Sequence, residues 1–137
     1  MWGIIGWDGV GSLRRVEGNL TGERYREEII YDIDQLCTRR RNNRIEHLIF
    51  QQDNAREHAA IDTYLFLLEK HVQWLDWPAV SPDLNLFEHV WSDVARRVKD
   101  LLPARTQNDL GQQVLVTWQA SPLDYIRSLF RFIYRRL

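Results

Sequence analysis

Apolar residues in the first part of the chain form two short runs and then a helical pattern. Trp2–Trp7 and Ser12–Val16 read as strands, and Asp8-Gly9 between them predicts a hairpin turn because both residues tolerate a positive φ. Thr21 is a suitable N-cap for a helix that follows. The buried face expected for this helix consists of Tyr25, Ile29, Ile33 and Leu36.

The middle of the chain alternates strand-like and helix-like segments. Ile45–Gln51 predicts a strand that runs directly into Asp53, and Arg56–Lys70 fits a helix. A short apolar piece, Val72–Trp77, comes next. Pro78–Asn85 contains two prolines and should be irregular.

The last third predicts three helices. Leu86–Leu102 is amphipathic and should end at Pro103, while Thr106 and Ser121 look like N-caps, with Pro122 at the first helical position. The apolar stripe of the first of these helices comprises Phe87, Val90, Trp91, Val94, Val98 and Leu101. Together the pattern predicts an α/β fold with a mixed sheet and a helical C-terminal part.

Composition narrows the class of protein. A chain of 137 residues with 45% hydrophobic content can bury one core, and a single cysteine provides neither a disulfide framework nor a cysteine zinc site. No apolar run reaches the ~18 residues of a membrane span, and the N-terminal sequence lacks the features of a signal peptide. We therefore expect an intracellular protein without a membrane segment.

Charge is uneven along the chain although the net charge is only −1. The region from Arg96 onward is basic, and Arg127, Arg131 and Arg135 follow one another at helical spacing. Such a stripe can track a DNA backbone, and DNA binding would then weaken steeply with salt. A solvated helix face explains the same pattern.

Two carboxylates are candidates for catalysis. Asp53 follows an apolar strand, and Glu88 lies in the first turn of an amphipathic helix at the border of its apolar stripe. Carboxylate oxygens suit hard cations such as Mg²⁺ or Mn²⁺, which in pairs promote phosphoryl transfer. Taken alone, Asp53 also reads as a turn or N-cap residue, and Glu88 as a residue that favours a helix N-terminus.

Two linked motifs decide between these interpretations. FQQDNAREHAA (Phe50–Ala60) followed by WPAVSPDLNLFEHVW (Trp77–Trp91) resembles the signature of the Tc/mariner superfamily of DDE transposases. The resemblance implies that Asp53 and Glu88 are the second and third catalytic acids and bind the metal directly. The 34 residues between them are the spacing typical of the branch whose third acid is Glu. Asn54, His58 and Asn85 match motif positions, for which we expect orienting or DNA-contacting roles.

The resemblance implies an RNase H-like fold, with a mixed sheet flanked by helices and two divalent metals, Mg²⁺ or Mn²⁺. It covers nearly all of residues 1–137, which we interpret as a partial catalytic domain. The family's first catalytic Asp lies on a central strand ahead of the Trp-Gly pair with which this chain opens. That strand and the helix-turn-helix DNA-binding region are both expected to be missing, so that the sheet is incomplete.

Two functions remain open from the sequence. The chain is part of a transposase that cuts and joins DNA, inactive as it stands because one of three acids is absent. Alternatively, it is a non-catalytic remnant or retained fragment that binds DNA or a related transposase. Whether the chain is itself an enzyme is left open. The family's work on chromosomes implies a nuclear location, DNA as partner and a possible transposase dimer.

Overall fold

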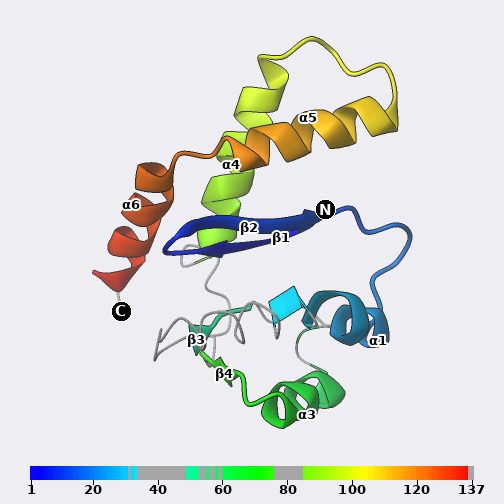
Figure 1. Cartoon of the computed structure of the whole chain (residues 1–137), viewed down its shortest axis with the longest axis vertical. Coiled ribbons are helices and arrows are strands. Elements are labelled where there is room, and N and C mark those ends of the chain that lie inside the picture. The colour runs from blue at the N-terminus through cyan, green and yellow to red at the C-terminus, as the bar shows by residue number, and fades with distance from the viewer. Residues whose placement is uncertain are drawn as a thin grey trace. The chain divides into compact units, whose positions relative to one another are not determined.

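A computed structural model describes residues 1–30, 32–33, 49–52, 55, 58, 60–75 and 85–135. The chain divides into two compact units (Figure 1). Unit 1 comprises Met1–Val16 and Pro82–Leu137, and unit 2 comprises Glu17–Ser81.

A β-hairpin opens unit 1. β1 (Trp2–Gly6) pairs antiparallel with β2 (Gly9–Arg14), and the register shifts between Gly3 and Ile5. The predicted hairpin is confirmed, but its turn residues are Trp7 and Asp8 rather than Asp8 and Gly9. Gly9 is the first residue of β2 and has a φ of 121°, a conformation open to glycine. The second strand begins at Gly9 rather than Ser12, because the turn is tight enough for pairing to resume at once.

Three helices complete unit 1: α4 (Leu86–Lys99), α5 (Gln107–Gln119) and α6 (Leu123–Tyr134). Thr106 is the N-cap of α5, as predicted, and forms a capping box with Asp109, in which each side chain accepts a hydrogen bond from the other residue's backbone N–H at 3.0 Å. α4 ends at Lys99, three residues earlier than predicted, because Asp100 already occupies the C-cap.

The predicted N-cap role of Ser121 is wrong. Pro122 occupies the cap position of α6 and Leu123 is the first helical residue, so Pro122 does not stand at the first helical position either. The Ser121 hydroxyl accepts a hydrogen bond from Arg97 Nη2 at 2.9 Å and lies 3.5 Å from the Thr117 carbonyl, to which it donates. Because these contacts occupy the side chain, it does not cap the helix.

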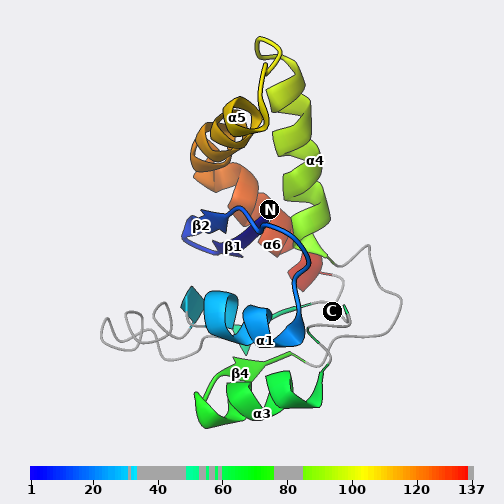
Figure 2. The ribbon, with the colours of Figure 1, turned by 90° about the vertical axis from the view of Figure 1, so that its right-hand side faces the viewer.

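The core of unit 1 lies where one face of the hairpin meets the three helices, as Figures 1 and 2 show. Val90 and Val94 of α4, Trp118 of α5 and Ile126 of α6 are its buried centre. The partly buried residues around it are Ile5, Val10, Leu13, Phe87, Trp91, Val98, Val114, Tyr125, Leu129 and Phe130. The predicted stripe of α4 is therefore confirmed except at its last position, since Leu101 is exposed.

Trp118 joins the hairpin to the helices. Its indole Nε1 donates to the Gly11 carbonyl at 2.9 Å, and a Cβ on Gly3 would lie 2.9 Å from its ring. Only glycine at position 3 leaves room for the ring in this arrangement. The glycine of the Trp-Gly pair is thus explained by packing.

Unit 2 contains α1 (Gly22–Arg24), a π-helical segment η1 (Tyr25–Ile30), α3 (Ile61–Glu69) and the strands β3 (Ile49–Phe50) and β4 (Gln73–Trp74). β3 and β4 pair in parallel. The predicted strand over 45–51 is seen only at Ile49–Phe50, and residues 45–48 lie outside the described part. The helix predicted from Arg56 begins at Ile61, because His58 is in a turn and Ala60 is the N-cap.

The predicted face of the first helix is confirmed at Tyr25 and Ile33, while the Ile29 side chain and Leu36 lie outside the described part of the chain. Thr21 is the N-cap of this helix, as predicted, and accepts a hydrogen bond from Arg24 N at 3.3 Å. Tyr25, Ile30 and Ile33 are buried. The wider π-helical period places residue 30, five positions after Tyr25, in the core, which a regular 3.6-residue pattern does not predict.

The strands of the described residues form two separate two-stranded sheets, one antiparallel and one parallel. With the helices of both units, this is the α/β architecture with mixed strand directions that the sequence predicts. No strand among the described residues links the two pairs.

Candidate functional site

Glu88 is an exposed residue in the first turn of α4. The buried residues Leu86 and Val90 fix this end of the helix, and Asn85 caps it by accepting a hydrogen bond from Phe87 N at 3.1 Å. The Glu88 carboxylate makes no ion pair or hydrogen bond with any described residue. Glu88 is therefore an exposed carboxylate on a fixed helix start, stabilised by the positive end of its helix.

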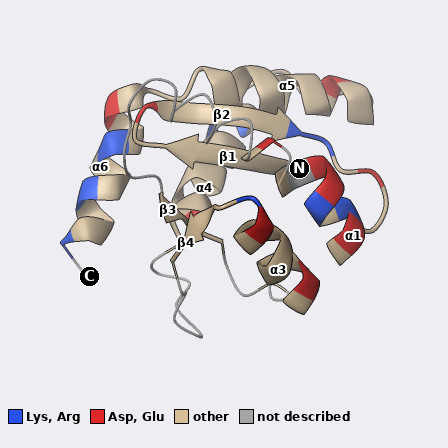
Figure 3. Cartoon of the chain, turned by 60° about the horizontal axis from the view of Figure 1, so that its bottom comes forward, with Lys and Arg blue, Asp and Glu red and all other residues tan. Residues whose placement is uncertain are grey.

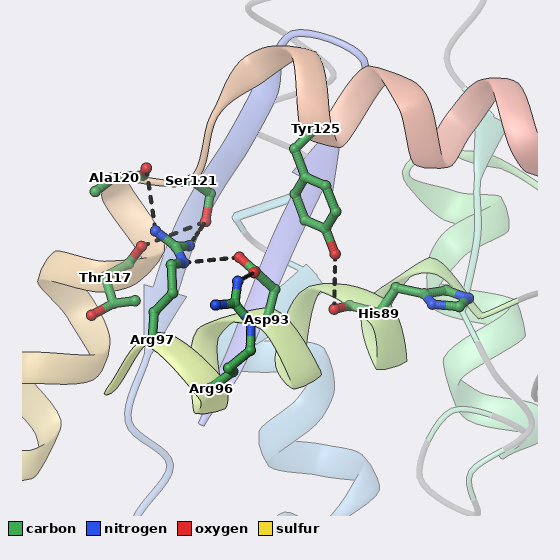
Figure 4. Close-up of polar contacts among 8 residues, drawn as sticks. All are labelled: His89, Asp93, Arg96, Arg97, Thr117, Ala120, Ser121 and Tyr125. Atoms are coloured by element: carbon green, nitrogen blue, oxygen red, sulfur yellow. Dashed lines mark hydrogen bonds and ion pairs between the residues drawn. The ribbon is translucent and has the colours of Figure 1, made fainter. Parts of the chain in front are cut away.

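Contacts from α6 and from the α5–α6 connection hold α4 in place (Figure 4). The Tyr125 hydroxyl donates to the His89 carbonyl at 3.0 Å, one residue from Glu88. Burial raises the pKa of Tyr125, and the nearby Asp93 carboxylate raises it further. The hydroxyl therefore stays protonated, as a donor, at neutral pH.

Arg97 forms the second contact of this kind. Its Nε lies 2.8 Å from Asp93 Oδ2 within α4, and Nη2 donates to Ser121 Oγ at 2.9 Å. Nη1 lies 3.4 Å from the Ala120 carbonyl, to which it donates (Figure 4). This half-buried guanidinium joins α4 to the start of α6, which orients the helix that carries Glu88.

Asp53 and Asn54 lie outside the described residues. Glu88 belongs to unit 1 and Asp53 to unit 2, so their proximity stays a prediction. Within the described ranges there is no group of three or more His, Cys, Asp or Glu side chains that could hold a metal ion.

The residues on either side of the 53–57 segment are described and are connected to each other. Gln52 Nε2 donates to the His58 carbonyl at 3.2 Å, and Gln52 Oε1 accepts from the Tyr25 hydroxyl at 2.7 Å. The His58 ring packs on the Tyr25 ring with 4.4 Å between centroids. Tyr25 and Gln52 were not among the predicted site residues. The position of Gln52 directly before Asp53 was the available signal, whereas nothing in the sequence connects Tyr25 with this segment.

The three arginines of α6 differ in their surroundings. The guanidinium groups of Arg127 and Arg131 lie 5.5 and 5.6 Å from the Trp7 ring centroid, and Arg127 Nε donates to the Trp7 carbonyl at 3.3 Å. Arg127 is half-buried, while Arg131 and Arg135 are exposed. Figure 3 shows that basic residues are spaced along α6. Arg127 therefore holds the hairpin turn to α6, whereas Arg131, although it lies over the Trp7 ring, is exposed like Arg135.

None of the helices in the described ranges has both the length and the apolar character that crossing a membrane requires.

Comparisons with known proteins show the relatives of the chain. The family model of the DDE superfamily endonucleases matches residues 12–111. The transposable element Tc1 transposase of Caenorhabditis elegans is 29% identical over 136 residues, and the Tcb2 transposase of Caenorhabditis briggsae is 32% identical over 136 residues. Each alignment covers 99% of this chain and 48% of the relative, so the chain spans about half the length of these transposases.

Solved structures show the fold. The catalytic domain of Mos1 transposase, determined with raltegravir and Mg, superposes with a TM-score of 0.78 at 19% identity, over 95% of this chain and 67% of that chain. The catalytic domain of Mos1 mariner transposase superposes with a TM-score of 0.76 at 18% identity, over 95% of this chain and 66% of that chain. The predicted RNase H-like fold with an incomplete sheet is confirmed. The family match over most of the chain shows that this protein belongs to the DDE superfamily endonucleases, in the Tc/mariner group of transposases.

Proposed function

We propose that this chain is the part of a transposase catalytic domain that supplies two metal-binding carboxylates, Asp53 and Glu88, for cutting and joining DNA. The observation that carries the proposal is the Glu88 carboxylate: it is exposed, unpaired within the described residues and fixed at the start of an anchored helix. The match to the endonuclease family supports a metal-binding role for this carboxylate.

The donor chemistry fits Mg²⁺ or Mn²⁺. Both proposed ligands are carboxylates, and hard divalent cations prefer oxygen. Bound there, such ions activate the attacking oxygen and neutralise charge that develops at phosphorus. Asp53 and Glu88 would hold the metal, while Asn85 fixes the first turn of α4 by its hydrogen bond to Phe87 N. Asn54 and His58 are proposed to orient the Asp53 segment or to contact DNA.

With two metal-binding carboxylates alone, we expect binding of metal and DNA rather than cleavage of DNA. Asp8, the first acidic residue of the chain, is in the hairpin turn of unit 1 and not on a strand. We therefore propose that these 137 residues by themselves bind metal and DNA without cutting, and that cleavage requires a third carboxylate. A nuclear location and pairing with another transposase molecule follow from this function and belong to the same proposal.

Metal binding to the 137-residue chain tests the proposal. Mn²⁺ binding, followed by the electron paramagnetic resonance signal of the free ion, should show one weak site. Asp53→Asn and Glu88→Gln should each weaken this site roughly tenfold or more, because each removes a charged oxygen ligand. Circular dichroism should show the same helix content in all variants.

Matched carboxylates elsewhere provide the controls. Asp124 stands in the first turn of α6 as Glu88 does in α4, and Asp62 stands in the first turn of α3 within the unit that contains Asp53. Asp124→Asn and Asp62→Asn should leave the Mn²⁺ affinity within about twofold, since long-range charge effects are screened by salt. Equal affinity in the two site variants and in these controls would show that Asp53 and Glu88 are not ligands.

A further inference from the structure

Tyr25 is a buried tyrosine in unit 2 whose hydroxyl has a specific partner. It is 1% exposed, and its hydroxyl donates to Gln52 Oε1 at 2.7 Å. A buried hydroxyl is costly without a partner, so this hydrogen bond holds the Gln52 side chain in one place. Position 52 directly precedes Asp53.

The nitrogen of the Gln52 side-chain amide also makes a hydrogen bond. With Oε1 accepting from Tyr25, Nε2 is directed to the His58 carbonyl and donates to it at 3.2 Å. The amide therefore joins the residue before the 53–57 segment to the residue after it. Because the Tyr25 hydroxyl determines which way the amide faces, the connection depends on Tyr25.

The Tyr25 ring provides a second contact at the far end of the segment. It packs against the His58 ring at 4.4 Å between centroids, with an interplanar angle of 37°. The His58 N–H also donates to the Ala55 carbonyl at 2.9 Å. One side chain thus contacts both residues that bracket the segment.

Tyr25 itself is held by the unusual start of its helix. Its N–H donates to the Thr21 carbonyl at 2.8 Å, and the π-helical segment begins at this residue. Arg24 donates to the Glu17 and Asn19 carbonyls, both at 2.8 Å, and pairs with Glu28 at 2.7 Å. These contacts fix the position of Tyr25, which contacts both Gln52 and His58. π-helical turns recur at functional sites.

We propose that Tyr25 is a positioning residue that, through Gln52 and His58, restricts the segment carrying Asp53 and so prepares this carboxylate for metal binding. The inference rests on the proposed function, because it takes Asp53 as a ligand. Tyr25 touches neither metal nor DNA in this account. Its effect is to reduce the conformational freedom that the segment loses when metal binds.

Tyr25→Phe is the first test, because it removes the hydroxyl and keeps the ring on His58. Hydrogen–deuterium exchange of the 137-residue chain should show about two- to tenfold less protection across residues 52–58, the effect of losing one hydrogen bond. The Mn²⁺ affinity should fall about two- to fivefold, and the helix content by circular dichroism should equal that of the control. The control is Tyr64→Phe in the same unit, whose ring packs on Trp74 and whose hydroxyl has no partner among the described residues.

Gln52→Leu tests whether the two residues act through one hydrogen bond. It removes both amide contacts, so the double variant Tyr25→Phe/Gln52→Leu should lose no more Mn²⁺ affinity than Gln52→Leu alone. Independent, additive losses would overturn the proposal.

The outcomes separate this inference from the proposed function. Unchanged exchange in Tyr25→Phe overturns the inference, whatever the metal data show. Reduced protection with unchanged Mn²⁺ affinity also overturns it, because the network would then be structural only. Failure of the proposed function has a different signature, since Asp53→Asn would then leave Mn²⁺ binding intact.

Discussion

Replacing Trp118 by alanine is expected to cost unit 1 about 3–5 kcal/mol of folding free energy, the range for truncating a large buried aromatic residue. Trp118 is 0% exposed, packs among Val90, Val94 and Ile126, and donates its indole N–H to the Gly11 carbonyl. The substitution leaves a cavity at the junction of hairpin and helices and removes that hydrogen bond. Urea denaturation followed by circular dichroism at 222 nm measures the loss, since α4, α5 and α6 provide much of the helical signal.

The control for this substitution lies on the same helix. Val116 is 61% exposed and two residues from Trp118. Val116→Ala should therefore change stability by no more than about 0.5 kcal/mol. A loss below about 1 kcal/mol for Trp118→Ala would mean that the hairpin is not packed on the helices through this ring.

Reversing two charges on α6, with Arg131→Glu and Arg135→Glu together, is expected to weaken binding to double-stranded DNA roughly 50-fold or more at ~0.1 M salt. Both side chains are exposed and one helical turn apart, so they can contact successive phosphates. Arg127 is left unchanged because it holds the hairpin turn through the Trp7 carbonyl. Fluorescence anisotropy of a labelled duplex should also show a shallower dependence of log affinity on log salt, by about two contacts.

A charge-matched control distinguishes a local contact from net charge. Lys99→Glu with Arg105→Glu changes the charge by the same amount at two exposed positions, the last residue of α4 and a residue of the α4–α5 connection. This variant should bind DNA within about threefold of the original chain at ~0.1 M salt, where distant charges are screened. Equal weakening by both double variants would show that α6 carries no specific DNA surface.

Helices of unit 1 could be predicted from sequence because their signals are local and agree with one another. In α5, the Thr106–Asp109 capping box fixes the start, and the apolar residues recur at helical spacing up to Trp118. The prediction that Ser121 is the N-cap of α6 was wrong for a physical reason. The Ser121 hydroxyl has the chemistry of a cap, but Arg97, which is distant in sequence, already donates a hydrogen bond to it. A contact between residues 24 positions apart leaves no local trace in the sequence.

Unit 2 was harder to predict because its geometry departs from regular periods. Tyr25 and Ile30 are both buried although they are five positions apart, a spacing that the π-helical segment permits and a 3.6-residue pattern does not predict. The strand over 45–51 depends on partners that are far away in sequence. β3 is described at only two residues and pairs with β4, 24 positions later.

The sequence motifs predicted the residues of the candidate site. They did not predict the residues that hold those site residues in place. Asp53, Glu88 and Asn85 stand within recognisable motifs, and the helix N-cap formed by Asn85 is seen directly. Tyr25 lies outside both motifs, and its connection to Gln52 spans 27 positions. The hydroxyl of Tyr125 reaches α4 from a different helix in the same way. Residues that orient a site by long-range contacts require a structure to identify.

Iron-directed cleavage of the 137-residue chain tests most directly whether Asp53 and Glu88 share one metal site. Fe²⁺ replaces Mg²⁺ at oxygen-ligand sites, and with ascorbate and peroxide it generates hydroxyl radicals that cut the nearby backbone, which mass spectrometry can map. Our account predicts cuts around residue 53 and around residue 88 together, both suppressed by excess Mg²⁺ and both lost in Glu88→Gln. Cuts at only one of the two positions, or cuts around 53 that persist in Glu88→Gln, would contradict a shared site.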